Sequence, residues 1–196
     1  MKLQQISASC YAILNEKNRL CDANSGFIDR GGGLLVDTQC DLAHARQMIE
    51  LLSDIDSTPP KYVVNTHEDM DHVWGNQLFR ESEILAHRTV PERMREVADP
   101  TPIRKLDRSI RHLITRTLVR WLHPGLYAVG LQLQEEYNFD DIELAFPTRL
   151  FDERCELELD GIAVHMIYVG PCHQVGDAIV HVPQERVVFA GDIVFQ

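Results

Sequence analysis

Histidine and aspartate side chains are concentrated in one short stretch of the sequence, Asn65-Thr66-His67-Glu68-Asp69-Met70-Asp71-His72. Imidazole nitrogens and carboxylate oxygens are good ligands for zinc, manganese and iron, so this stretch can converge on a metal ion. A solvated acidic turn would explain the same residues when they are considered alone. The stretch therefore indicates either a metal-binding loop or an exposed turn, and other segments are needed to distinguish the two.

A further histidine and a further carboxylate occur in comparable places later in the chain. His173 lies in a glycine-containing segment, residues 170–177, that follows an apolar run, and Asp192 directly follows the apolar residues 187–190. Functional sites of open α/β sheets gather at the carboxyl ends of strands, and all three segments follow predicted strands. Together they favour a shared metal site over an exposed turn.

The segments that must position these residues alternate between strands and helices. Apolar runs predict strands at 9–14, 34–37, 61–65, 83–86, 164–169, 178–182 and 187–190, the last two forming a hairpin. Asp41 is a predicted N-cap for a helix with one apolar face. Residues 88–136 carry spaced apolar residues among many arginines, which predicts one or two inserted amphipathic helices, and β structure resumes from Ile142. The order predicts a mixed α/β layered fold.

The bulk properties restrict the class of protein. A length of 196 residues suits one domain, predicted over residues 1–196 with a helical insert at about 88–136. The formal net charge of −11 disfavours nucleic acid as the main partner, because an acidic surface repels phosphates. No apolar run approaches the ~20 residues of a membrane span, and no clear signal peptide is present, so we expect no membrane partner. Five cysteines without a C-x-x-C pair favour reduced thiols in the cytoplasm.

Taken together, the polar segments resemble the metallo-β-lactamase superfamily. The likeness consists of the acidic strand end at Asp37, a loop of the T-H-x-H-x-D-H type at residues 66–72, a loop of the G-H-T-x-G-(D/S) type at His173, and the F-x-G-D strand end at residues 189–192. This combination is specific, whereas each motif alone is weak. The resemblance covers nearly the whole chain and implies an αβ/βα four-layer sandwich with the metal site at one edge.

The resemblance also implies a set of metal ligands. They are His67, Asp69, Asp71, His72, His173 and Asp192. Asp192 matches the carboxylate that bridges two ions, whereas Asp69 stands where the family usually has its second histidine. A carboxylate there raises the affinity for manganese or iron relative to a three-histidine site. The last histidine of the family pattern lies on a later strand than this chain contains, so we expect an incomplete C-terminal half.

A metal-dependent hydrolase is the function that the resemblance implies. One or two ions, zinc first with iron or manganese as alternatives, would lower the pKa of a bound water to roughly 7 and so provide a hydroxide nucleophile. Asp71 would be a ligand that also orients this water. The expected substrate is a small ester, thioester, lactone or amide, and the sequence does not identify it further, because specificity lies in the loops around the site.

Two other functions stay open at this point. Some members of the superfamily oxidise a thiol adduct with iron, and a degenerate or truncated copy could keep a binding or assembly role without turnover. Asp69 and the absent last histidine are compatible with the second alternative. The apolar residues 187–190 at the end of the chain predict an uncovered face, and hence a homo-oligomer or dependence on a missing C-terminal segment.

The other candidate residues are predicted to be structural. The histidines in this group are His44, His87, His112, His123, His165 and His181. Trp74 is expected to pack under the metal loop, and Cys172 to pack rather than bind metal. The arginines of residues 104–120 are expected to form a solvated helix face.

Overall fold

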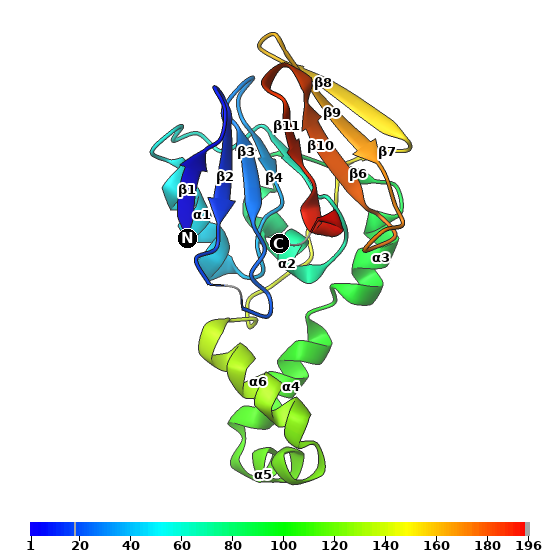
Figure 1. The fold of residues 1–196 in the computed structure, drawn as a ribbon. Helices are drawn as coiled ribbons and strands as arrows, with labels where there is room; N and C mark the ends of the chain where they lie inside the picture. The colour runs from blue at the N-terminus through cyan, green and yellow to red at the C-terminus, as the bar shows by residue number, and fades with distance from the viewer. Residues whose placement is uncertain (18, 195–196) are drawn as a thin grey trace.

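The computed structural model describes residues 1–17 and 19–194, with residues 113–115 described as backbone only. Two sheets face each other, and a group of helices extends away from them (Figure 1). The larger sheet has seven strands in the order of the chain. They are β1 (Lys2–Gln5), β2 (Cys10–Leu14), β3 (Ser25–Ile28), β4 (Leu34–Val36), β5 (Tyr62–Val64), β6 (Glu83–His87) and β7 (Arg149–Phe151).

The pairing of these strands determines where the polar loops meet. Strands β1 to β4 are antiparallel, whereas β4, β5, β6 and β7 pair in parallel. The carboxyl ends of the parallel strands therefore lie at one edge of the sheet. Asp37 follows β4 and His67 follows β5, so the two segments emerge side by side.

The smaller sheet has four antiparallel strands in the order β11-β10-β9-β8. They are β8 (Arg154–Leu159), β9 (Ile162–Tyr168), β10 (Ala178–Val182) and β11 (Val187–Phe189). The predicted hairpin of the last two strands is confirmed, with Val182 paired to Val187.

Apolar cores cover both faces of the larger sheet. Leu34 and Val36 face the smaller sheet, where they join a cluster with Val164 and Val180. Leu35 points the other way into a cluster under α1 (Leu42–Leu52). Because successive side chains of a strand alternate between faces, a strand buried on both sides is a continuous apolar run. Each fully buried leucine or valine stabilises the fold by about 1.5–3 kcal/mol.

Helix α1 begins where the sequence predicted. The Asp41 carboxylate accepts a hydrogen bond from the His44 backbone N–H at 2.7 Å, which satisfies one of the unpaired amides of the first turn. The helix then packs Met48 and Leu52 against the large sheet. The predicted N-cap is confirmed.

The insert differs from the predicted one or two helices. It contains α3 (Val90–Val97), α4 (Thr101–Arg111), α5 (Leu113–Leu122) and α6 (Pro124–Glu136). Helices α3, α4 and α6 each carry a proline in the first turn, at positions 91, 102 and 124. Proline is compatible with the first turn but not with a helix interior, so these residues divide the insert. No helix of the described residues is long and apolar enough to cross a membrane.

The predicted return to β structure at Ile142 was also wrong, and three strands were missed. Residues 142–148 are irregular and β structure resumes only at Arg149, while β1, β3 and β8 were not predicted. The fold class is nevertheless confirmed, since a helix layer and two facing sheets form a mixed α/β architecture. The metal-loop residues lie in α2 (Met70–Val73) and the loop before it, and Asp192 lies in a 3-10 turn after β11.

Candidate metal centre

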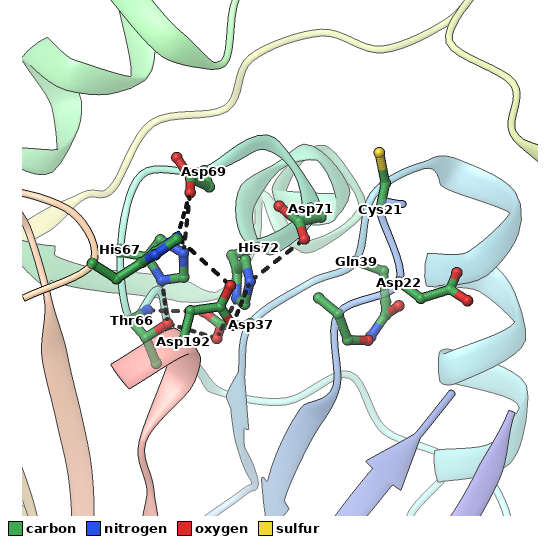
Figure 2. Close-up of polar contacts among 12 residues, drawn as sticks. Cys21, Asp22, Asp37, Gln39, Thr66, His67, Asp69, Asp71, His72 and Asp192 are labelled. Carbon is green, nitrogen blue, oxygen red and sulfur yellow. Dashed lines mark hydrogen bonds and ion pairs between the residues drawn. The ribbon is translucent and has the colours of Figure 1, made fainter. Parts of the chain in front are cut away.

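The structure brings all six sequence-predicted ligands together beside the carboxyl ends of β4 and β5, and Figure 2 shows five of them: His67, Asp69, Asp71, His72 and Asp192. Ligand atoms of His67, Asp69 and His173 lie within 4.8 Å of one another. Ligand atoms of His67, His72 and Asp192 form a second group within the same limit. The Asp71 carboxylate lies beside this group, with Oδ2 3.7 Å from Nε2 of His72. The arrangement offers positions for two ions.

The loop of residues 170–177, the His173 loop, brings a third histidine to the site. His173 Nε2 is 3.0 Å from Oδ2 of Asp69 and 3.7 Å from Oδ2 of Asp192. Asp192 Oδ1 in turn lies 3.4 Å from Nε2 of His72. Asp192 is therefore in contact with both groups, as expected of a bridging carboxylate.

Two buried nitrogens indicate that a cation belongs here. Within the described residues, Nε2 of His67 and Nε2 of His72 are buried and have no hydrogen-bond partner. A buried polar atom without a partner costs about 1–3 kcal/mol, which a metal–ligand bond would offset. The ring centroids are 4.0 Å apart, so both nitrogens are available in the same small volume. Imidazoles combined with carboxylates are a donor set that fits zinc, iron or manganese.

Hydrogen bonds to the other ring nitrogens fix the tautomers. The Thr66 hydroxyl donates its single proton to Asp37 Oδ2 at 2.8 Å, so at its 2.9 Å contact with His67 it accepts from Nδ1–H. His72 Nδ1 lies 2.9 Å from the same Asp37 oxygen and donates to it. Each imidazole thus keeps a proton on Nδ1, and with a metal bound it would direct the lone pair of Nε2 into the site, as metal-binding histidines require.

Asp37 itself is held in a conformation that few residues adopt. Its φ is 62°, in the left-handed region that aspartate and asparagine tolerate better than most residues. Its second oxygen accepts from the Thr66 backbone N–H at 2.8 Å. This backbone geometry places one carboxylate where it contacts His72 directly and His67 through the Thr66 hydroxyl.

Two further carboxylates hold the His173 loop, and sequence reasoning missed their role. Glu68 is fully buried and accepts from the backbone amides of Val175 at 3.2 Å and Gly176 at 3.0 Å. Asp177 accepts from three backbone amides, those of Cys172, His173 and Gln174. A Cβ on Gly176 would lie 2.5 Å from the Glu68 carboxylate, so glycine permits this approach.

The electrostatic environment is dominated by the acids. Burial by itself would raise the pKa of Asp69, but the contacts with His67 and Gln174 lower it to about 2. Burial raises the pKa of Asp71, and the charges of Asp192 and Asp69 add to this effect. Burial would lower the pKa of His72, but the charge of Asp37 and the contact with Asp192 raise it well above its ordinary value. A cation entering the cluster would replace a proton, so metal uptake is linked to proton release.

Comparison with protein families agrees with this geometry. The profile of the metallo-β-lactamase superfamily matches residues 18–196. The chain belongs to this superfamily. Membership supports a metal-dependent hydrolase at the level of the family. A search of curated proteins found no significant match.

Solved structures of low sequence identity share the fold. A metallo-β-lactamase from Pontibacter korlensis has a TM-score of 0.61 at 13% identity, over 96% of this chain and 70% of its own. The sec-alkylsulfatase Pisa1 from Pseudomonas sp. has 0.62 at 16%, over 93% of this chain and 29% of its own. The flavodiiron protein from Giardia intestinalis has 0.59 at 14%, over 97% and 40%. The chain thus spans between 29% and 70% of these proteins.

A cavity of about 730 Å³ adjoins this metallo-β-lactamase-type centre. Asp71, His72 and Asp192 line one part of it, and the apolar side chains of Leu14 and Phe189 line another. A pocket of this size accommodates a small organic molecule.

A third group that could hold a metal, Cys40, Asp41 and His44, is better explained as structural. Asp41 caps α1 and lies 2.7 Å from His44 Nδ1, while Arg19 lies 3.0 Å from His44 Nε2. Burial raises the pKa of the Cys40 thiol, which keeps it protonated and a poor ligand. Both nitrogens of His44 are therefore occupied by protein groups.

The other residues predicted to be structural are placed as follows. Trp74 packs as predicted, since it is fully buried, contacts Phe139 edge-on and donates to the Ala98 carbonyl at 2.7 Å. The packing prediction for Cys172 was wrong, because the side chain is exposed at the surface of its loop. Arg104 also departs from the solvated face, since it donates to the Phe139 and Ile142 carbonyls and ties α4 to the irregular segment.

Proposed function

We propose that this chain forms the metal centre of a metal-dependent hydrolase that acts on a small ester, thioester, lactone or amide. The observation that carries the proposal is the pair of buried Nε2 atoms of His67 and His72, which have their tautomers fixed by Thr66 and Asp37. A structural pair of histidines would use both nitrogens within the protein. Here Nε2 of each ring has no hydrogen-bond partner in the protein and could bind a metal ion.

The two groups of ligand atoms define which residues would hold each ion. His67, Asp69 and His173 would hold one, and His72, Asp192 and Asp71 the other, with Asp192 within reach of both. When bound, such ions lower the pKa of coordinated water and polarise a substrate oxygen. Zinc is the metal we expect first.

The protein side chains would contribute orientation. Asp71 lines the cavity, where it would hold an ion and orient the water bound to that ion. Leu14 and Phe189 give the cavity an apolar wall that favours an organic substrate and excludes water from one side. Asp37 and Thr66 keep both imidazoles oriented throughout.

Metal content and hydrolysis by matched variants test the proposal. We expect the purified chain, loaded with zinc, to hydrolyse at least one of a nitrophenyl ester, a thioester and a lactone. His67→Ala and Asp192→Ala should each lose most bound metal and all hydrolysis, while His112→Ala, a change on the distant helical insert, should retain both. Full metal occupancy in His67→Ala would refute the site assignment. Metal binding without hydrolysis would favour the degenerate, non-catalytic alternative.

Asp69 supports a second candidate, an iron-dependent oxidation of a thiol adduct. A carboxylate in place of imidazole makes the first group of ligands harder, which raises its relative affinity for iron or manganese. One of the fold relatives is a flavodiiron protein, although at 14% identity it shares only the fold. Iron as the dominant bound metal, together with oxygen uptake on addition of a thiol adduct, would favour this candidate over hydrolysis.

A further inference from the structure

Helices α4, α5 and α6, residues 101–136, form a projection that we call the helical arm (Figure 1). The three helices contact one another and bury Ile110, while Leu133 joins the apolar cluster of the body that contains Trp74 and Phe139. Gly130 allows α6 to approach α4 closely, because a Cβ there would lie 2.0 Å from the Ile110 side chain. The three helices therefore pack around Ile110, and a group of other large apolar side chains stays exposed.

The exposed apolar residues gather towards the far end of the arm. They are Leu118, Trp121, Leu122, Leu126 and Val129, and Trp121 is 79% exposed. Leu118, Trp121 and Leu122 have the i, i+3, i+4 spacing that places side chains on one face of a helix. Grouped exposed apolar side chains of this kind mark a surface that another body covers.

The charge of the same region is opposite to that of the rest of the chain. Residues 108–134 contain four arginines and no aspartate or glutamate, although the whole sequence has 30 acidic and 19 basic residues. Arg116 and Arg120, four residues apart on α5, are both exposed and lie on a different face from Trp121. A helix with arginines on one face and tryptophan and leucine on the next is typical of helices that lie in a membrane interface.

We propose that the helical arm docks on an anionic lipid surface. Leu118, Trp121 and Leu122 enter the boundary between headgroups and acyl chains, and Arg116 and Arg120 contact lipid phosphates. Helices of this type lie in the surface and need no membrane-spanning length, so the short apolar runs of the sequence do not oppose it.

A lipid surface fits these observations better than a second copy of the chain. Arg111 is paired with Asp107, but symmetric contact between the apolar faces of two α5 helices would bring Arg116 and Arg120 of both copies together, and residues 108–134 contain no acid to neutralise them. Contact between the arm and the acidic body of another copy would satisfy the arginines, but the projecting apolar side chains would need a matching apolar groove. A bilayer accommodates a projecting apolar end of any shape.

Tryptophan fluorescence provides a direct test, because the chain has two tryptophans in opposite environments. Trp74 is fully buried and Trp121 is exposed, so a blue shift on adding vesicles reports the arm. We expect a blue shift and co-sedimentation with vesicles of phosphatidylcholine and phosphatidylglycerol, and neither with phosphatidylcholine alone. Salt should weaken the binding. Trp121→Phe should abolish the shift while leaving the emission of Trp74.

Charge variants on matched positions complete the test. Arg116→Gln/Arg120→Gln should weaken partitioning about 30-fold, since each arginine near an anionic surface contributes about one kcal/mol. Arg46→Gln/Arg80→Gln, which removes two exposed arginines from the body, should bind vesicles like the unaltered chain. Unchanged binding of the arm variant, or no binding to anionic vesicles at low salt, overturns the proposal. A blue shift that follows protein concentration without lipid, together with a dimer in sedimentation, would instead identify a second copy as the occupant.

Discussion

The candidate metal centre and the loops that hold it, which we call the metal edge, differ from the helical arm in which side chains they bury. At the metal edge, charged and polar groups are buried and almost every one has a specific partner, as Asp37 and Glu68 illustrate. In the arm, large apolar groups such as Trp121 are exposed, and exposed arginines lie on a neighbouring face of the same helix. A buried polar network fixes positions because a lost partner costs free energy, whereas an exposed apolar surface constrains the fold very little. Substitutions at the metal edge should therefore change metal binding by displacing its ligands. Substitutions on the helical arm should change only its binding to another surface.

Among substitutions that leave the six candidate ligands in place, the largest effect should come from removing the charge of Asp37. Asp37→Asn keeps a side chain that tolerates positive φ, but it removes the carboxylate that orients His72 and accepts from Thr66. We expect metal affinity to fall about 10–100-fold in competition with a chelator, as for other residues that orient metal ligands.

The matched control is Asp160→Asn, at a turn that also has positive φ but lies in the β8–β9 connection. It should leave metal affinity unchanged, as should Arg116→Gln/Arg120→Gln on the arm. If Asp37→Asn and Arg116→Gln/Arg120→Gln lost metal affinity equally, the metal edge and the arm would not act independently.

A smaller and more selective effect is expected at Glu68. In Glu68→Gln the backbone amides of Val175 and Gly176 face one neutral acceptor in place of a carboxylate, so the His173 loop is held less firmly. We expect the ion held by His173 to bind about tenfold more weakly, because one hydrogen bond to a charged group contributes about 1.5–3 kcal/mol. Titration of metal stoichiometry should then resolve a weak and an unchanged site. A uniform loss at both sites would mean that Glu68 supports the whole edge.

Asp69→His should change which metal binds rather than how much. The variant has the three-histidine set that softer metals prefer, so its zinc content should rise relative to iron and manganese after growth in the same medium. Elemental analysis of both proteins provides the measurement. Identical metal content would show that Asp69 does not contact the metal.

The smallest effect should be a pH-dependent change in stability at Glu185. Its carboxylate accepts hydrogen bonds from Ser7 and from Ser9, joining the β10–β11 turn to the segment between β1 and β2. Burial would raise its pKa, but these bonds lower it from 4.5 to about 2. The contribution is thus complete above the unfolded pKa and is lost as pH falls through about 2.

Glu185→Gln should accordingly lower the melting temperature by about 2–4 °C near neutral pH, and the difference should shrink only below the unfolded pKa of 4.5. Melting curves of both chains between pH 7 and about pH 2 measure the difference. A difference that stays constant across this range would contradict the assignment. Asp160→Asn again serves as the control, because it removes a carboxylate but leaves the hydrogen bonds from Ser7 and Ser9 to Glu185 in place.

The positions of the candidate ligands were predictable because their loops follow apolar runs that form strands. His67 follows β5 and Asp192 follows β11, and the parallel pairing around β5 makes the loops converge. Strand β1 was not predictable from pattern, because Lys2, Gln4 and Gln5 give a polar edge strand without alternation. The roles of Glu68 and Asp177 were not predictable either, since a carboxylate that accepts from backbone amides leaves no spacing in the sequence.

The two regions also differ in how far apart along the chain their contacts lie. Glu68 meets Gly176 across 108 positions and Ser7 meets Glu185 across 178, whereas the helices of the arm contact their sequence neighbours. Closing long loops costs chain entropy before the contacts compensate for it, which slows their formation. We expect the arm to assemble early during refolding and the metal edge to assemble last. The rate of metal capture by a refolding chain would then report on the joining of the two sheets.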